Sequence, residues 1–324
     1  MKTITLEEHY ASPSFLDGPG KRLREHASAF TGPRANLLEQ LSDVGEKRIA
    51  EMDAAGIDMQ VLCLTSPGAE QLEGDEAITV ARASNDFLAD AVRRNPTRLA
   101  GFATLPTAIP DKAAEELERA VNKYGFKGAI INGHVRGCYL DDKFFWSIFE
   151  KAEAMGVPVY IHPTQPPKPV VDAYYSGFDS QVSYIFANVG WGWHIETGVH
   201  VLRMVLGGVF DRYPKLQIVI GHLGEALPFM IQRVNYKMPP AITKLKHPVS
   251  YYLRENVHYT FAGFNFTPTF TDLLSEVGID RIMFSADYPY ESMAEARKFL
   301  DTLPISADDK EKIAHGNAER LFKL

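Results

Sequence analysis

TITLEEHY, residues 3–10, joins a short apolar and β-branched run to acidic and imidazole side chains. The part from Thr3 to Leu6 is typical of a buried strand, and Glu7 and His9 follow at its carboxyl end. Residues two apart on an extended strand face the same side, so Glu7 and His9 can share one ligand. The stretch therefore predicts a strand that carries chemistry at its end.

Seven further apolar runs predict strands, at 59–64, 99–104, 128–131, 158–161, 217–220, 257–260 and 282–285. Amphipathic stretches predict a helix after each strand, at 45–55, 75–94, 111–123, 141–155, 199–210, 227–236, 269–277 and 293–303. Strands that alternate with helices indicate βαβ units around a parallel sheet. Eight such units predict an α/β fold, a single (β/α)8 TIM barrel. No Pro/Gly-rich linker divides the 324 residues, so we expect one domain over 1–324.

Composition and charge exclude several classes of protein. The net charge of −7 and the lack of a Lys/Arg cluster argue against nucleic acid as a partner. Residues 1–16 carry acidic side chains where a signal peptide needs an apolar stretch, and no apolar run reaches the ~18 residues of a membrane span. We therefore expect a cytoplasmic protein without a membrane partner. Because Cys63 and Cys138 are the only cysteines, a metal site must use histidine and carboxylate ligands.

Side chains that commonly bind metals follow four of the predicted strands. Glu7 and His9 follow the first strand, His162 the fifth, His222 the sixth and Asp287 the eighth. The carboxyl ends of all strands in a TIM barrel meet at one mouth, so we expect these side chains to lie together. Imidazole combined with carboxylate suits Zn, Mn or Fe better than Ca or Mg, which prefer oxygen alone. The sequence therefore predicts a metal site at this mouth.

The remaining histidines and the aromatic residues of the long connections are interpreted by position. His134 and His194 could reach the pocket, whereas His200 is expected to face helices and His258 to lie inside a strand. Histidines remote from strand ends are expected at the surface or in packing, namely His26, His247 and His315. Aromatic residues of the connections at 8–44 and 163–198 either line a pocket or pack as loop residues, namely Tyr10, Tyr174, Tyr175, Trp191 and Trp193.

Seven segments, spread over nearly the whole chain, resemble the amidohydrolase superfamily. Within it they are similar to the decarboxylases of γ-resorcylate, 2,3-dihydroxybenzoate, 5-carboxyvanillate and aminocarboxymuconate semialdehyde. The segments are LEEH (6–9), RIAEMD (48–53), LTSPG (64–68), YIHP (160–163), GHLGE (221–225), SADYP (285–289) and HGNA (315–318).

The resemblance implies one divalent metal ion per chain, Zn or Mn. Its ligands would be Glu7, His9, His162 and Asp287, with His222 held near the metal by Glu225. The first motif is Glu-x-His, as in the benzoate decarboxylases, where most of the superfamily has His-x-His. The segment 130–133 reads Ile-Ile-Asn-Gly and lacks the lysine that bridges two metals in many binuclear hydrolases. One metal, not two, is therefore expected.

The same resemblance implies a reversible, non-oxidative decarboxylation. The substrate would be a small aromatic carboxylate of the ortho-hydroxybenzoate type, which can chelate a cation through its carboxylate and hydroxyl oxygens. Protonation of the ring carbon before loss of CO2 avoids an aryl carbanion. The resemblance assigns that proton to Asp287, with His222 and Glu225 as a proton shuttle. Substrate contacts are expected from Arg233, Tyr10, Ser66, Trp193 and Tyr288.

The sequence leaves alternatives open. Relatives carry an arginine eight residues after the glutamate of the 221–225 segment, where Arg233 stands, which implies a homodimer or homotetramer with a shared active site. Arg233 could instead be a surface residue, and Glu225 a helix N-terminal carboxylate favoured by the helix dipole. A metal-dependent hydrolase of an ester, lactone or amide, with Asp287 as general base, is the second functional hypothesis. A barrel that only binds is the third.

Overall fold

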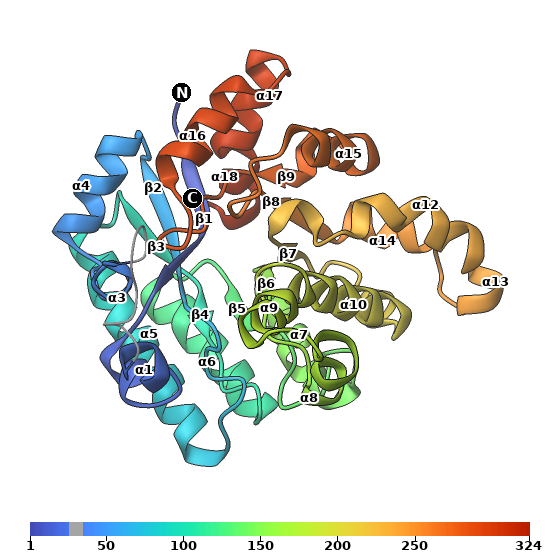
Figure 1. Cartoon of the computed structure of the whole chain (residues 1–324), viewed down its shortest axis with the longest axis horizontal. Coiled ribbons are helices and arrows are strands. Elements are labelled where there is room, and N and C mark those ends of the chain that lie inside the picture. Colours follow the sequence, from blue (N-terminus) through green and yellow to red (C-terminus); the bar gives the residue numbers. More distant parts are fainter. Residues whose placement is uncertain (26–34) are drawn as a thin grey trace.

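The computed structural model describes residues 1–25 and 35–324 and consists of parallel strands surrounded by helices (Figure 1). The strands are β1 (Ile4–Tyr10), β2 (Met59–Leu64), β3 (Leu99–Gly101), β4 (Ala103–Thr104), β5 (Ala129–Asn132), β6 (Val159–His162), β7 (Ile218–Ile220), β8 (Val257–Thr260) and β9 (Ile282–Met283). Every ladder between neighbouring strands is parallel. The expected surface or packing residue His26 lies outside the described residues.

Two junctions complete the ring of strands. Phe102 separates β3 from β4, but its N–H donates to the Leu62 carbonyl at 2.9 Å, so β3 and β4 are two parts of one strand. At the other junction β1 and β9 meet through one parallel bridge, between Leu6 and Ser285. Counted in this way, the described residues form eight strands, which confirms the predicted TIM barrel.

A bulge in β1 decides which side chains face the inside of the barrel. Ile4 and Leu6 pack in the interior cluster, so strict alternation would turn Glu8 inward and Glu7 outward. The ladder with β2 shifts its register between Thr5 and Glu8, and Glu7 adopts a left-handed backbone with φ of 66°. The predicted shared face of Glu7 and His9 is therefore observed, but it depends on this irregularity.

The helices cover the outside of the ring, and most lie where the sequence predicts them. Those of the barrel are α4 (Glu46–Ala55), α5 (Gly74–Arg94), α6 (Pro110–Tyr124), α7 (Trp146–Met155), α10 (Gly192–Leu206), α11 (Val209–Arg212), α12 (Leu227–Lys237), α14 (Val249–Glu255), α15 (Thr267–Val277) and α16 (Met293–Thr302). Shorter ones fill connections and the C-terminal segment, namely α1 (Pro13–Asp17), α2 (Lys21–Glu25), α3 (Leu37–Ser42), α8 (Lys168–Val170), α9 (Ser180–Ala187), α13 (Pro240–Thr243), α17 (Ala307–Glu311) and α18 (Asn317–Phe322).

The predicted helix at 199–210 needs correction. Helix α10 begins seven positions earlier, at Gly192, and ends at Leu206, and Gly208 with φ of 79° separates it from α11. Glycine and β-branched residues lower the helix propensity of the first turns, but burial of their inner face outweighs this cost. His194 therefore lies on a helix and not in a loop.

The bottom of the barrel is closed by the C-terminal helix. Ala318 and Phe322 of α18 belong to the same apolar cluster as the inward side chains of the strands, and the Phe322 ring lies 5.4 Å from that of Phe102. The open end therefore lies at the carboxyl ends of the strands. Among the described residues, no helix combines the length and apolar character needed to cross a bilayer.

Replacement of Phe322 by alanine should leave a cavity under the barrel. Because the ring is only 4% exposed, we expect the free energy of unfolding to fall by about 3–5 kcal/mol in chemical denaturation. Phe144→Ala, at a ring that is 59% exposed, is the control and should change it by less than about 0.5 kcal/mol. Equal losses in the two variants would contradict the closing role of α18.

Candidate metal centre

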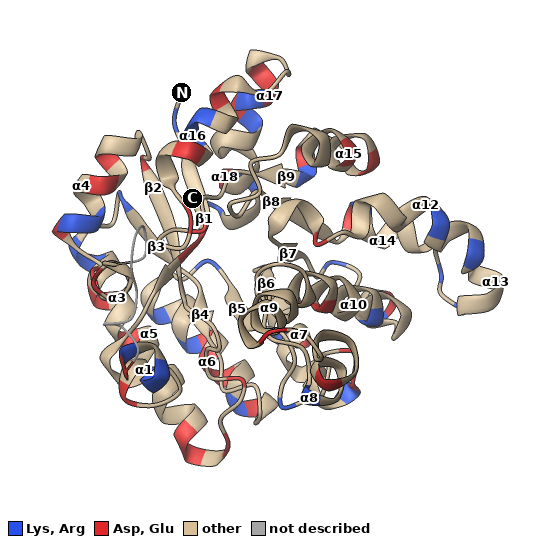
Figure 2. Cartoon of the chain, in the orientation of Figure 1, with Lys and Arg blue, Asp and Glu red and all other residues tan. Residues whose placement is uncertain are grey.

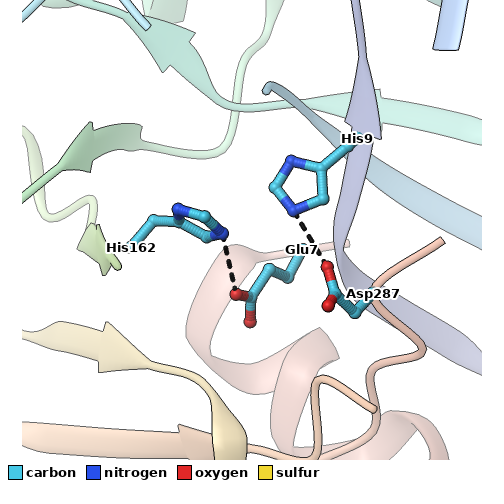
Figure 3. A group of neighbouring side chains, drawn as sticks. All are labelled: Glu7, His9, His162 and Asp287. Carbon is cyan, nitrogen blue, oxygen red and sulfur yellow. Dashed lines mark ion pairs between the residues drawn. The ribbon is translucent and has the colours of Figure 1, made fainter. Parts of the chain in front are cut away.

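Four side chains from two strands and one loop converge at the open end of the barrel (Figure 3). Glu7 and His9 come from β1, His162 from the last residue of β6, and Asp287 from the loop after β9. His9 Nε2 lies 3.0 Å from Asp287 Oδ1, and His162 Nε2 lies 3.3 Å from Glu7 Oε1. One ligand atom from each residue lies within 4.8 Å of all the others, as a shared cation requires.

Glu7 is a carboxylate buried inside the barrel. The Tyr160 hydroxyl donates to Glu7 Oε2, and the Thr260 hydroxyl lies 3.4 Å from the same oxygen. Burial raises the pKa of Glu7 to about 8, with His222 opposing the rise and Asp287 adding to it. Gly221 leaves the space that this carboxylate needs, because a Cβ there would lie 2.4 Å from Glu7 Oε2.

The remaining atoms of this group suit a divalent cation. Glu7 Oε1 and His9 Nε2 are buried and, apart from their close approaches to His162 and Asp287 within the group, have no hydrogen-bond partner. His9 Nδ1 lies 3.5 Å from Cys63 Sγ. Burial lowers the pKa of His9 to about 3 and that of His162 well below its usual value, so both imidazoles are neutral. Neutral imidazole is the form that binds metals, and two carboxylates balance the charge of one divalent ion.

A second buried group lies next to the first and consists of His222, Glu225 and His194. Glu225 accepts hydrogen bonds from His222 Nδ1 at 2.7 Å and from His194 Nδ1 at 2.8 Å. Burial lowers the pKa of His222, but Glu225 and Glu7 outweigh it and raise the value to about 10. Burial would raise the pKa of Glu225, but the two histidines lower it to about 2. The carboxylate is thus engaged by two imidazoles, which favours the orienting role over the helix-dipole interpretation.

Comparison with known proteins assigns this arrangement to a family. A family model described as amidohydrolase matches residues 39–324. The chain belongs to the amidohydrolase family.

The relatives of this amidohydrolase include decarboxylases that match it over its whole length. It is 36% identical to a gamma-resorcylate decarboxylase of Polaromonas sp., over 99% of this chain and 98% of the relative. A 5-carboxyvanillate decarboxylase of Novosphingobium aromaticivorans, solved with manganese and 4-hydroxy-3-methoxy-5-nitrobenzoic acid, matches with a TM-score of 0.91 and 35% identity, over 100% and 96% of the two chains. A dihydroxybenzoic acid decarboxylase of Polaromonas sp., solved with manganese and 2-nitroresorcinol, matches with a TM-score of 0.89 and 35% identity, over 100% and 97%.

Of the expected substrate residues of this amidohydrolase, Trp193 lies beside the metal centre. The Trp193 ring lies 6.4 Å from the His162 ring, on the first turn of α10. Ser66 is half-buried in the loop after β2. Arg233 is exposed on α12, and the structure does not bring it to the four donors of its own chain.

Tyr10 and Tyr288 face away from the centre, which corrects two expectations. Tyr10 stacks on Phe87, and its hydroxyl donates to the Ser84 carbonyl in the core next to α5. Tyr288 turns outward, with its ring 4.8 Å from the Arg48 guanidinium carbon. Strand alternation places Tyr10 on the face opposite His9, and Tyr288 follows Asp287 with the opposite orientation.

Of the two histidines expected to reach the pocket, only His194 does so, through Glu225. His134 is held in the loops, with Nε2 3.1 Å from the Gln165 carbonyl and Nδ1 accepting the Gly137 N–H. His200, on α10, accepts the Leu140 N–H at 3.1 Å and packs against the Tyr139 ring, so it faces the connection after β5 and not the expected helices. His258 lies inside β8, as expected.

Sequence reasoning missed three aromatic residues that lie next to the metal ligands or next to His222. Tyr160 precedes His162 by two positions on β6, and this alternation was the signal that could have found it. The Tyr290 ring lies 5.3 Å from the His9 ring, and the Phe264 ring 5.2 Å from that of His222. These two belong to irregular loops, where no periodicity indicates orientation.

Gly221→Ala tests the space around Glu7. The backbone φ of −87° tolerates alanine, but the new Cβ would displace the Glu7 carboxylate. We expect Mn²⁺ affinity, measured by calorimetric titration, to fall by roughly 10- to 100-fold, as for other changes that misplace a metal ligand.

Gly316→Ala is the matched control, because its φ is −59° and the nearest atom to its Cβ lies 3.6 Å away. Its Mn²⁺ affinity should equal that of the wild type. A wild-type affinity in Gly221→Ala would show that Glu7 does not bind the ion.

Proposed function

We propose that this amidohydrolase is a metal-dependent, non-oxidative decarboxylase of a hydroxylated aromatic acid, such as an ortho-hydroxybenzoate. The observation that carries the proposal is the position of Asp287, a carboxylic acid that faces both the buried donor set and His222. The named decarboxylases that match the chain at 35–36% identity over 96% or more of their length support the same chemistry.

The residues that would hold one divalent cation are Glu7, His9, His162 and Asp287. When bound, a cation such as Mn or Zn supplies a Lewis acid to which the carboxylate and adjacent hydroxyl of the substrate can chelate. Manganese is the ion in two of the matching decarboxylase structures. The rings of Trp193 and Phe264 lie beside His162 and His222 and offer an apolar surface to an aromatic ring.

Asp287 transfers the proton in the proposed reaction. Its protonated carboxyl donates to the ring carbon that bears the carboxylate, which forms a C–H bond. The bond between that carbon and the carboxyl carbon then breaks, its electron pair restores the aromatic ring, and CO2 leaves. Protonation before cleavage avoids an aryl carbanion. A carboxylic acid at this position therefore lowers the activation barrier of the decarboxylation.

His222 supplies and recovers the proton. Its Nε2 lies 3.9 Å from Asp287 Oδ2, and the hydrogen bond from Nδ1 to Glu225 fixes the orientation of the ring. His194 holds the second oxygen of Glu225, so the carboxylate cannot rotate away. His194 on α10, Glu225 and His222 thus form a hydrogen-bonded chain that ends next to Asp287.

Asp287→Asn tests the proton transfer. The amide keeps the shape and one oxygen ligand but cannot donate the same proton, so kcat for CO2 release should fall by about 10²- to 10⁴-fold. In wild-type enzyme assayed in D2O with a panel of hydroxybenzoates, mass spectrometry should find one deuterium on the ring carbon that held the carboxylate.

The hydrolase alternative predicts a different label. An ester, lactone or amide hydrolase would place oxygen from H2¹⁸O in a new carboxylate and no deuterium on the ring. That result would overturn the decarboxylase proposal. Tight metal binding without turnover of aromatic acids, esters or lactones would favour a protein that only binds.

We also propose a homodimer, or a dimer of dimers, in which Arg233 reaches the active site of the neighbour. Helices α9, α12 and their surroundings expose large apolar side chains, among them Tyr184 at 66%, Phe229 at 81% and Tyr236 at 74%. Helix α12 projects from the side of the barrel together with α13, and α9 carries no charged residue (Figures 1 and 2). Apolar surface of this kind marks an interaction site, and a planar guanidinium suits a substrate carboxylate.

Mixing of two inactive variants tests the shared site. If Arg233 acts across the interface, a hybrid dimer of Arg233→Ala and Asp287→Asn chains contains one intact site. Statistical mixing then restores about one quarter of wild-type activity in a closed dimer. Lys237→Ala on the same helix is the control and should be active alone.

No recovery on mixing, or full activity from a protein that light scattering finds monomeric at micromolar concentration, would refute the shared site. The cytoplasmic location, the single domain over 1–324 and the absence of a nucleic-acid partner stay predictions of the sequence.

A further inference from the structure

We propose that Glu8 is a positioning residue, which holds the loop of Asp287 in place against the strand that carries Glu7 and His9. Its carboxylate accepts the N–H of Ala286 at 2.9 Å through Oε1 and the N–H of Tyr288 at 3.1 Å through Oε2. These two residues flank Asp287. The inference rests on the proposed metal centre but not on the proposed reaction.

The need for Glu8 follows from the junction between β1 and β9. After the bridge between Leu6 and Ser285 the two strands no longer form a ladder, because β1 bulges at Glu7 and β9 has ended. The N–H groups of Ala286 and Tyr288 are buried and would have no strand partner. A buried donor without a partner costs free energy, so the Glu8 carboxylate takes the place of two main-chain carbonyls.

Asp287 needs this support because of its backbone. Its φ of 64° is left-handed, a conformation that non-glycine residues hold only when the surroundings fix it. Its carbonyl accepts the N–H of Tyr290 at 2.9 Å, and the His9 N–H donates to the Tyr288 carbonyl at 2.7 Å. Glu8 and the His9 main chain therefore hold the loop from one side, which sets the 3.0 Å approach of His9 Nε2 to Asp287 Oδ1.

Glu8 is itself held by a buried network. Gln60 Nε2 lies 3.4 Å from Glu8 Oε2, and Gln60 Oε1 accepts from Arg48 at 3.2 Å. Arg48 also donates to the His9 carbonyl at 2.6 Å. The network thus links the main chain of one metal ligand to the loop of another.

Glu8→Gln is the primary test. Glutamine has the same shape, but its NH2 group would face one of the two backbone N–H donors, so the loop loses one of its bonds. We expect the Mn²⁺ dissociation constant, followed by the electron paramagnetic resonance signal of free Mn²⁺ without substrate, to rise by roughly 10- to 100-fold.

Glu116→Gln is the matched control. Glu116 is a carboxylate only 1% exposed that is held by Asn85 and Arg119 on the outer helices, away from the donors. This variant should unfold at a lower temperature but bind Mn²⁺ as the wild type does. Equal weakening in both variants would mean that Glu8 acts only through general stability and would overturn the proposal.

Gln60→Met provides a second variant in case Glu8→Gln does not fold. It removes a partner of Glu8 without touching the Asp287 loop, and it should weaken Mn²⁺ binding in the same direction, by about 3- to 10-fold. Wild-type Mn²⁺ affinity in whichever of the two variants folds would overturn the inference. Because no substrate is present, this outcome is independent of whether the enzyme is a decarboxylase.

Discussion

A carboxylate buried inside an apolar barrel is the constraint on which the site depends. An isolated charge at the position of Glu7 would be strongly unfavourable, and the structure answers this with the hydroxyls of Tyr160 and Thr260 and with neighbouring imidazoles. The bulge that turns Glu7 inward and the glycine at 221 that leaves room for it serve the same end. Even so, Glu7 Oε1 accepts no hydrogen bond, so its lone pairs are available to a cation.

The two buried polar groups at the mouth, the four metal ligands and the His222–Glu225–His194 group, differ in charge. In the donor set, burial keeps His9 and His162 neutral beside the carboxylates of Glu7 and Asp287, so the set as a whole lacks positive charge. In the adjacent group, Glu225 holds its charge and raises the pKa of His222. One group is suited to receive a cation and the other to handle a proton, and they lie close enough for Asp287 to belong to both.

Strand number and the donors at strand ends could be predicted from the sequence, because parallel strands in a barrel direct their carboxyl ends to one place. What the sequence could not predict was orientation in irregular backbone. The bulge at Glu7 reverses the alternation of Ile4 and Leu6, and Tyr10 and Tyr288 lie beside metal-ligating residues but face the outer core. Helix α10 begins earlier than its propensity indicates because tertiary packing holds its first turns.

The junction of β1 with the loop after β9 also has a consequence for synthesis of the protein. Glu8 and its partner Ala286 are 278 positions apart in the chain, and the metal ligands beside them are separated by a similar distance. A ribosome makes Glu7 and His9 early, His162 near the middle and Asp287 late, so all four ligands are present only after most of the barrel has been synthesised. Full coordination therefore requires the first and the last strand to have met, so closure of the barrel is the folding step that completes the site.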